Sequence, residues 1–320
     1  MMQNSPYNYS VIIPHHDIPD LLERCLRSIP VREDVQVIVV DDASAPEHQD
    51  RLHQLELAFP GAEFIYSPSN RGAGAARNIG LEHATGKWLI FADADDFFAE
   101  NFGEILDEYI HEPADIVYFY NRCVESEDVA LSSTAATEYN NFITLAIETG
   151  QDTPLRYRHW VPWGKLIKRN LVSSNNLQFE EIPYSNDIVF SASAGCLARK
   201  IIADDRYLYC YCSRHSSLSN EMNSKPGELQ VRAKACFRYQ KAVHEFGYTI
   251  TGRYPISDFL IPLYHQDKQL FDDLFLRLQE IGCSPWDILR QMRGWEKGYV
   301  NKLRLYLYAL PRYYRSVRNG

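Results

Sequence analysis

The stretch KWLIFADADDFF, residues 87–98, decides how the rest of this chain is interpreted. Residues 88–92 are a continuous apolar run, which is typical of a short buried strand. Three carboxylates follow at once, on Asp93, Asp95 and Asp96. Clustered acids at the end of a buried strand are costly unless a positive group lies beside them. A divalent cation with oxygen ligands, often shared with a phosphate, meets that need, so the stretch predicts a metal-assisted site.

Apolar runs alternate with amphipathic segments through the first hundred residues. Strands are predicted at residues 9–14, 35–40, 62–66 and 88–92, and helices at residues 20–29 and 51–59. Residues 69–84 are predicted to be a glycine-bearing loop that runs into a helix. This alternation predicts an α/β fold, in which helices cover both faces of a mostly parallel central sheet. Ligands bind beyond the carboxyl ends of the strands in such sheets. Because Pro14, the pair Asp41–Asp42 and the acid cluster all lie where strands end, we expect them to meet in one crevice.

Three other interpretations compete for these motifs. The loop GAGAAR at residues 72–77 is an incomplete dinucleotide fingerprint, because Arg77 stands where the third glycine is required, and this disfavours a nicotinamide-dependent dehydrogenase. Phosphatases with an aspartyl nucleophile also place D-x-D after a strand, but near the start of their domain, whereas here it closes the fourth strand. Helix capping explains one acid, and three exceed what capping requires.

The composition bounds the class of protein. A length of 320 residues, a net charge of −9 and 45% hydrophobic residues suit a soluble globular protein and disfavour a general nucleic-acid binder. Seven scattered cysteines without a C-x-x-C spacing predict reduced thiols and a cytosolic location, with Cys210 and Cys212 as packing residues. No signal peptide is visible, and no run reaches the roughly 18 apolar residues that a membrane helix needs.

The ordered set SVIIP, VIVVDDAS and NRGAGAARNIGLEHATGKWLIFADADD resembles the family 2 glycosyltransferases of the GT-A fold, which transfer a sugar from a nucleotide diphosphate donor. The resemblance continues, less strictly, through WGKLIKR at 163–169, FE at 179–180, NDIVF at 186–190 and RHSSLS at 214–219. It implies a catalytic domain at residues 1–219. Within it, residues 1–98 would form the nucleotide-binding half and residues 99–219 the acceptor half.

The resemblance implies a donor side built from the first half of the chain. Pro14 is expected to line the nucleotide pocket, and Asp42 to accept hydrogen bonds from the base, usually uracil. Asp41 would shape the site, and Arg77 would lie near the nucleotide, where it could meet a diphosphate or pair with an acid. The family often has Tyr-Asn after the first-strand proline, where this chain has two histidines, so its donor pocket is expected to differ.

The resemblance also implies a metal ion, Mn²⁺ or Mg²⁺, and a catalytic base. Asp95 is the expected metal ligand, Asp93 would touch the ion or the ribose, and Asp96 the donor sugar or diphosphate. His215 is a further candidate ligand of the metal or the diphosphate, and Asp187 is the expected base. The family usually has Glu-Asp at the pair that contains the base, where this chain has Asn-Asp. A solvated or helix-capping aspartate is the competing interpretation of this position.

The chemistry explains why such a site needs carboxylates. A leaving nucleoside diphosphate carries developing negative charge, which a hard divalent cation with oxygen ligands stabilises. The attacking hydroxyl of the acceptor has a high pKa and needs a carboxylate within hydrogen-bond reach. A single base on the face opposite the leaving group gives a one-step displacement with inversion, which is the family's usual outcome.

The pattern turns helical from residue 220 onward and predicts a helical C-terminal extension at residues 220–320, in which Pro262 interrupts a helix. Residues 288–320 carry eight Lys or Arg against one acid, interleaved with tyrosine and leucine. Such a helix suits an anionic membrane surface, which a lipid-linked acceptor would explain. Docking on the acidic catalytic domain and an oligomer contact are the alternatives.

The sequence therefore predicts an inverting, metal-dependent hexosyl- or N-acetylhexosaminyl-transferase. Its expected donor is a UDP-sugar, and its expected acceptor is a glycan or lipid-linked saccharide in surface polysaccharide synthesis. We expect a cytoplasmic protein with no nucleic-acid partner, peripheral on the inner face of the membrane if the basic C-terminus binds lipid. The alternative is a catalytically silent GT-A module that binds nucleotide sugar or glycan, which intact Asp95 and Asp187 disfavour.

Overall fold

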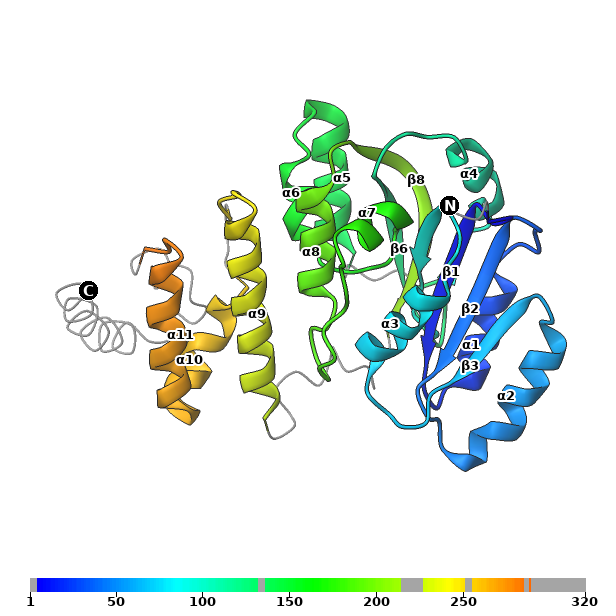
Figure 1. Cartoon of the computed structure of the whole chain (residues 1–320), viewed down its shortest axis with the longest axis horizontal. Coiled ribbons are helices and arrows are strands. Elements are labelled where there is room, and N and C mark those ends of the chain that lie inside the picture. Colours follow the sequence, from blue (N-terminus) through cyan, green and yellow to red (C-terminus); the bar gives the residue numbers. More distant parts are fainter. Residues whose placement is uncertain (1–4, 132–135, 214–226, 251–254, 285–287, 289–320) are drawn as a thin grey trace. The chain divides into compact units, whose positions relative to one another are not determined.

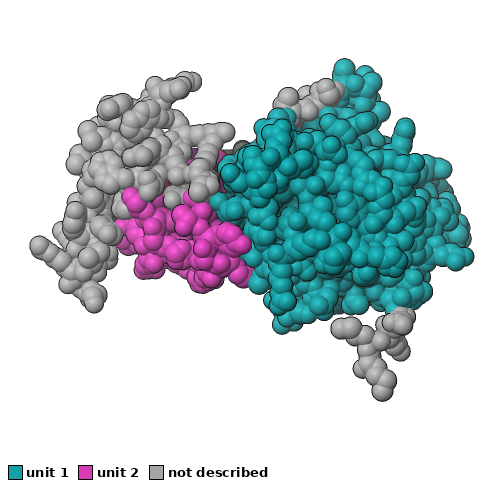
Figure 2. Space-filling model, turned by 90° about the horizontal axis from the view of Figure 1, so that it is seen from above, with its two compact units in different colours: residues 1–221 teal, residues 222–320 magenta. Residues whose placement is uncertain are grey.

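The computed structural model describes residues 5–131, 136–213, 227–250, 255–284 and 288. The chain divides into two compact units, residues 1–221 and 222–320, which Figure 2 colours separately. The first unit holds a mixed sheet with helices α1 to α8, and the second holds helices α9 to α11 (Figure 1).

The described part of the first unit is built on one eight-stranded sheet, in the order β3-β2-β1-β4-β7-β6-β8-β5. The strands are β1 Tyr9–His15, β2 Val35–Asp41, β3 Ala62–Tyr66, β4 Trp88–Phe91, β5 Phe97–Phe98, β6 Ile116–Glu125, β7 Lys165–Lys168 and β8 Ile201–Ser213. Strands β3, β2, β1 and β4 run parallel, as does β6 beside β8. Strand β7 is antiparallel to β4 and β6, and β5 is antiparallel to β8. The predicted α/β fold is confirmed, and its largest parallel part, β3-β2-β1-β4, comes from the first hundred residues.

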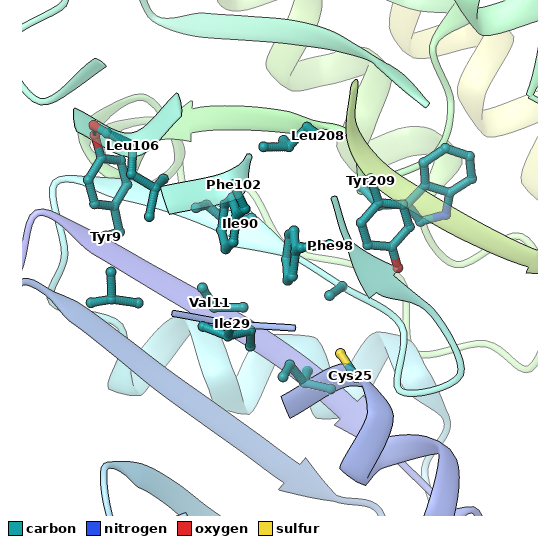
Figure 3. Packing of buried hydrophobic residues seen from close by; sticks show 14 of the residues in the cluster. Tyr9, Val11, Cys25, Ile29, Ile90, Phe98, Phe102, Leu106, Leu208 and Tyr209 are labelled. Carbon is teal, nitrogen blue, oxygen red and sulfur yellow. Dashed lines mark hydrogen bonds between the residues drawn. The ribbon is translucent and has the colours of Figure 1, made fainter. Parts of the chain in front are cut away.

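Alternating side chains of the strands build a separate apolar layer on each face of the sheet. In β1, Val11 and Ile13 join one layer and Ile12 the other. The first layer packs under α1 Pro19–Arg27, α2 Pro46–Ala58 and α4 Phe102–Tyr109. The second packs under α3 Ala73–His83, α5 Thr137–Thr149, α6 Thr153–Arg158, α7 Arg169–Ser174 and α8 Ile188–Leu197. Figure 3 shows part of the first layer, with Ile90 and Tyr209 among its members.

The strand order indicates where a ligand would bind at the edge of the sheet. Strand β1 is central, because it pairs with β2 on one side and with β4 on the other. Helix α1 leaves β1 toward the first layer, whereas α3 precedes β4 in the second layer. The connections on the two sides of β1 therefore diverge beyond its carboxyl end, and that divergence leaves room for a ligand in sheets of this kind.

The second unit contains α9 Glu228–Glu245, α10 Ser257–Gln266 and α11 Lys268–Glu280. The expectation that Pro262 interrupts a helix is wrong, because Pro262 lies inside α10. The break comes at Asp267, whose side chain accepts a hydrogen bond from the backbone N–H of Leu270 and so starts α11. The basic segment 288–320 lies outside the described residues except for Ile288. No helix in the described part of the chain is long and apolar enough to cross a membrane.

Candidate active site

The carboxylate of Asp41, the last residue of β2, is held in a closed polar cluster. Its Oδ1 accepts hydrogen bonds from His15 Nδ1 at 2.8 Å and from Ser44 Oγ at 2.5 Å. Since His15 Nε2 accepts the backbone N–H of Ile18 at 3.2 Å, the ring proton lies on Nδ1 and is donated to Asp41. Burial alone would raise the pKa of Asp41, but the hydrogen bonds from His15 and Ser44 outweigh it and lower the pKa. An ionised Asp41 therefore ties the ends of β1 and β2 together.

Asp42 fixes the loop that leads into α3. Its side chain is buried, and Oδ2 accepts the backbone N–H of Gly72 at 2.6 Å. The backbone N–H of Arg71 lies 3.0 and 3.1 Å from the two oxygens. Ala43 has a φ of 56°, in the left-handed region, which costs a residue with a side chain about 1–2 kcal/mol. Both oxygens of Asp42 therefore hold the backbone of this loop.

Helix α3 is clamped to the segment at residues 179–186. A β-carbon on Gly74 would lie 2.1 Å from the carbonyl oxygen of Glu180, so only glycine lets the helix approach this closely. Asn78 exchanges two hydrogen bonds with the backbone of Phe179, at 2.8 and 3.0 Å. These contacts join α3 to a segment 101 residues further along the chain.

Arg77 lies between the predicted donor and acceptor sides. It is 5% exposed, its Nη2 donates to Asp93 Oδ1 at 2.5 Å, and its Nη1 donates to Asn186 Oδ1 at 2.9 Å. The guanidinium also lies over the ring of Phe179, 5.3 Å from the centroid. Arg77 was expected either to meet a diphosphate or to pair with an acid. The structure shows it paired with an acid, Asp93.

Asp96 is the buried member of the acid cluster. Its Oδ2 accepts the hydroxyl of Tyr209 at 2.7 Å, and its Oδ1 accepts the backbone N–H of Cys212 at 2.7 Å. The Tyr209 oxygen in turn accepts the backbone N–H of Asp93 at 2.8 Å. Burial, followed by the charges of Asp95 and Asp93, raises the pKa of Asp96 well above its usual value, against the pull of these hydrogen bonds. Asp96 therefore anchors the acid loop to β8.

Asp93 and Asp95 are the open members of the cluster and fit a hard cation. The Asp93 side chain is 30% exposed, Asp95 is half-buried, and the carbonyl oxygen of Asp95 accepts a hydrogen bond from Arg24. Among the residues that the structure describes, no three or more His, Cys, Asp or Glu side chains are grouped to hold a metal. A cation at these two carboxylates would complete its shell with phosphate oxygens and water, as Mg²⁺ commonly does. His215 lies outside the described residues.

Three aromatic rings fix the position of Asp187, which directly precedes α8. Phe179 and Phe190 stack with centroids 3.9 Å apart, and Phe91 at the end of β4 meets both edge-on, at 5.1 and 5.6 Å. Such pairs contribute roughly 0.5–1.5 kcal/mol beyond the area that they bury. The start of α8 is thereby fastened to the strand that carries the acid cluster.

Asp187 is half-buried, and within the described ranges its carboxylate receives a hydrogen bond from its own backbone N–H but none from another residue. Burial raises its pKa, the charge of Arg77 and the hydrogen bond from its own backbone N–H act to lower it, and the charge of Asp93 adds to the rise. A carboxylate with a raised pKa is a stronger base than an ordinary aspartate, and its remaining lone pairs can receive a hydroxyl.

The structure brings the predicted residues into two connected groups. Pro14 lies buried in β1 opposite Val40, next to the polar cluster of Asp41 and the loop held by Asp42. Arg77 links Asp93 to the segment that carries Asp187. The sequence did not predict that Tyr209 belongs to the site. Its hydrogen-bond partner Asp96 lies 113 residues away along the chain, and no local sequence pattern indicates this bond.

The family model described as Glycosyl transferase family 2 matches residues 10–161. The uncharacterized glycosyltransferase EpsJ of Bacillus subtilis (strain 168) is 28% identical over 244 residues, which are 71% of this chain and 69% of that protein. The matched stretches span about two thirds of the length of each of three such curated relatives, EpsJ included.

Solved structures share the fold. TarS of S. aureus, residues 1–349, in complex with UDP-GlcNAc, has a TM-score of 0.63 and 16% identity, over 89% of this chain and 84% of that one. The mannosyltransferase PcManGT from Pyrobaculum calidifontis, in complex with GDP-Man and Mn²⁺, has a TM-score of 0.51 and 16% identity, over 96% of this chain and 84% of that one. By its matched motifs, its relatives and its sheet, the chain is a glycosyltransferase of the GT-A fold that is similar to glycosyl transferase family 2.

Proposed function

We propose that this glycosyltransferase is an inverting, metal-dependent enzyme that moves a hexose or N-acetylhexosamine from a nucleotide diphosphate sugar. The observation that carries the proposal is Asp187, whose carboxylate has a raised pKa, accepts no hydrogen bond from another described residue, and follows Asn186, which Arg77 ties to Asp93. A one-step displacement needs a base on the acceptor side and groups for the diphosphate on the donor side, held in fixed relation.

A UDP-sugar is the favoured donor. The TarS complex contains UDP-GlcNAc and the PcManGT complex contains GDP-Man, so nucleotide sugars bind to proteins of this fold. Pro14, Asp41 and Asp42 lie at the carboxyl ends of β1 and β2, the edge at which ligands bind in such sheets. Pro14 would line the base pocket and Asp42 would accept a hydrogen bond from the base.

Asp93 and Asp95 would hold Mn²⁺ or Mg²⁺, with His215 as a further candidate outside the described residues. When bound, the ion neutralises the charge that develops on the leaving diphosphate. Mn²⁺ is the first ion to test, because it accompanies GDP-Man in the PcManGT complex. Asp96 would serve this site by holding the acid loop on β8, because both of its oxygens are already bonded there.

Asp187 would take the proton of the acceptor hydroxyl while the hydroxyl oxygen bonds to the anomeric carbon. The bond from that carbon to the diphosphate breaks, and its electron pair leaves with the nucleoside diphosphate. Attack from the face opposite the leaving group inverts the anomeric centre, so an α-linked donor yields a β-glycoside. A glycan or lipid-linked saccharide of a surface polysaccharide would be the acceptor.

The test is a panel of UDP-, GDP- and dTDP-sugars, with Mn²⁺, scored by thermal shift and by hydrolysis in the absence of acceptor. A donor that binds only the folded protein should raise the melting temperature, and water should replace the acceptor in a slow release of nucleoside diphosphate. Removing the metal with a chelator should stop the release. Binding without any turnover would instead indicate the catalytically silent module.

Membrane association of the basic segment is a separate proposal, because residues 288–320 lie almost wholly outside the described residues. The full chain should sediment with vesicles of anionic lipid at low salt, and less so at high salt. Unchanged sedimentation after deletion of residues 296–320 would count against the proposal.

A further inference from the structure

The first unit contains a groove that has no part in the proposed transfer step. Its volume is about 1170 Å³, and it lies between the end of α1, the start of α4 and strands β5, β6 and β8. Pockets for drug-sized ligands have volumes of roughly 300–1,000 Å³. The groove is therefore large enough for a ligand of several rings.

Strand pairing builds the floor of this groove. Arg122 of β6 and Phe97 of β5 are both paired in register with Cys210 of β8, so the three residues form one row across the strands. Residues in such a row lie on the same side of a sheet, and all three line the groove. Their neighbours along the strands, Phe98 and Tyr209, point into the first apolar layer instead (Figure 3). The pairing of the strands therefore fixes which side chains the groove presents.

Two aromatic rings in the groove each lie beside a guanidinium group. Arg24 lies over Phe97, 5.4 Å from the ring centroid, and Arg122 lies over Tyr207, 5.0 Å from the centroid. Tyr207 is 38% exposed, so much of its ring is open to a ligand. Arg24 is also tied to the acid cluster, because its Nη2 donates to the carbonyl oxygen of Asp95. The groove therefore adjoins the loop that carries the candidate metal ligands.

The charged side chains that line the groove have both signs. The cations are Arg24, Arg27, Arg122 and Arg206, and the acids are Glu100, Glu104 and Asp205. Arg27 and Arg206 are paired with the carboxylates of Glu23 and Asp204. Arg122 is exposed and has no carboxylate partner among the described residues. The groove therefore offers hydrogen-bond donors and acceptors in the same space, without a large excess of either charge.

This lining favours one class of ligand over the others. A phosphate only accepts hydrogen bonds and would meet the acids, whereas an ammonium group only donates them and would meet the arginines. The centres of protein–protein interfaces are depleted in charged residues, so a protein partner fits poorly as well. A sugar hydroxyl both donates and accepts, and the C–H groups of a sugar ring can pack on an aromatic face. A neutral saccharide therefore matches every kind of group in the groove.

We propose, on the basis of the proposed glycan acceptor, that this groove is a second saccharide-binding site, which holds a neutral segment of the acceptor chain away from the bond that forms. The chain would pack on Tyr207 and Phe97 and exchange hydrogen bonds with Arg122 and the acids. A second contact on one chain acts at high effective concentration, so the groove would tighten acceptor binding without touching the reacting hydroxyl.

The experiment measures the binding of neutral hexasaccharides to the full chain by titration calorimetry, with and without UDP and Mn²⁺. The probes are maltohexaose, cellohexaose, mannohexaose and N-acetylchitohexaose. At least one should bind, and UDP should not weaken it, because the groove is separate from the donor site. Tyr207→Leu and Arg122→Gln should each weaken that binding roughly tenfold. Arg199→Gln is the matched control and should bind as the wild type does, since Arg199 is also an exposed arginine of the first unit but does not line the groove.

The outcomes separate this site from the proposed function. Binding of none of the four probes, or binding that Tyr207→Leu and Arg122→Gln leave unchanged, would overturn the saccharide site. Competition by UDP would assign the sugar to the donor site and would overturn it too. Dextran sulfate that binds more tightly than the neutral probes, and loses that binding in Arg122→Gln, would show a site for polyanions instead.

Failure of the proposed function would be visible separately, as absence of donor hydrolysis by the wild type, and the binding measurements do not depend on turnover. If Tyr207→Leu does not fold, Arg122→Gln carries the comparison alone, because Arg122 is exposed. Equal affinities of Arg122→Gln and Arg199→Gln for the bound hexasaccharide would then refute the proposal.

Discussion

Two aspartates of the first unit, Asp96 and Asp187, each have a pKa that burial raises, yet the two lie in opposite surroundings. Asp96, beyond β4, is 1% exposed, and both of its oxygens are bonded to β8. Asp187, before α8, is half-buried, and among the described residues its carboxylate is bonded only to its own backbone N–H. A raised pKa alone therefore does not identify a catalytic group. The difference lies in whether the lone pairs of the carboxylate are already occupied.

The largest effect is expected for Asp187→Asn. Positioned general bases contribute about 10²–10⁴-fold, so kcat/KM should fall by roughly a thousandfold, or about 4 kcal/mol of transition-state stabilisation. Thermal shift with nucleotide sugar should be unchanged, because the Asp187 side chain makes no hydrogen bond to another described residue, and its backbone bond to Ser191 is kept in the variant. Asp267→Asn is the matched control, since Asp267 also precedes a helix but lies in the second unit. Retention of full activity by Asp187→Asn would remove Asp187 as the base.

The converse result is expected for Asp96→Ala, which should cost about 3 kcal/mol of folding free energy in urea unfolding. The substitution leaves the Tyr209 hydroxyl and the Cys212 N–H without their acceptor in a buried place. Asp96→Asn should cost less, about 1 kcal/mol, because the site already favours a neutral group there. Equal stability of Asp96→Ala and the wild type would show that the acid loop does not depend on β8.

Arg77→Lys tests the link between the two regions. Lysine keeps the charge but cannot donate to Asp93 and Asn186 together as the guanidinium fork does. We expect kcat/KM to fall roughly tenfold, or about 1.4 kcal/mol, with a smaller change in melting temperature. A rate equal to that of the wild type would mean that the fork does not align the two halves.

The smallest effect is expected for Tyr209→Phe, which removes one hydroxyl and keeps the ring. Its stability should fall by about 1 kcal/mol, because Asp96 Oδ2 loses its donor and the Asp93 N–H loses its acceptor. The ring still stacks on Trp163, 5.3 Å between centroids. A loss as large as that of Asp96→Ala would assign the anchoring to the tyrosine instead of the carboxylate.

The parts of the fold that the sequence could predict are those with local signals. The strands of the first half are apolar runs that end in proline or acids, and their predicted bounds lie within a residue of β1 to β4. The acid cluster was visible for the same reason, since three carboxylates adjoin one buried strand. The expectation for Pro262 failed, because tertiary packing of α10 overrides a local breaker.

The division of roles among the acids could not be read from the sequence, because it depends on distant partners. In the sequence the three aspartates are the same residue type on one short stretch, so nothing separates their roles. In the structure, Tyr209 and Cys212 of β8 donate hydrogen bonds to both oxygens of Asp96.

The central claim is that Asp187 accepts the proton, and the acid limb of the wild-type profile tests it most directly. Because burial raises the pKa of Asp187, the base is lost on acidification at a pH above the ordinary aspartate value of about 3.9. We would measure kcat/KM for donor hydrolysis from pH 4 to 9 at saturating Mn²⁺, in the wild type and in Asp187→Asn. The account predicts a wild-type rate that rises with pH through a limb above pH 4, and a residual rate in the variant that lacks this limb. A wild-type rate that is flat down to pH 4, or a limb that persists in Asp187→Asn, would contradict it.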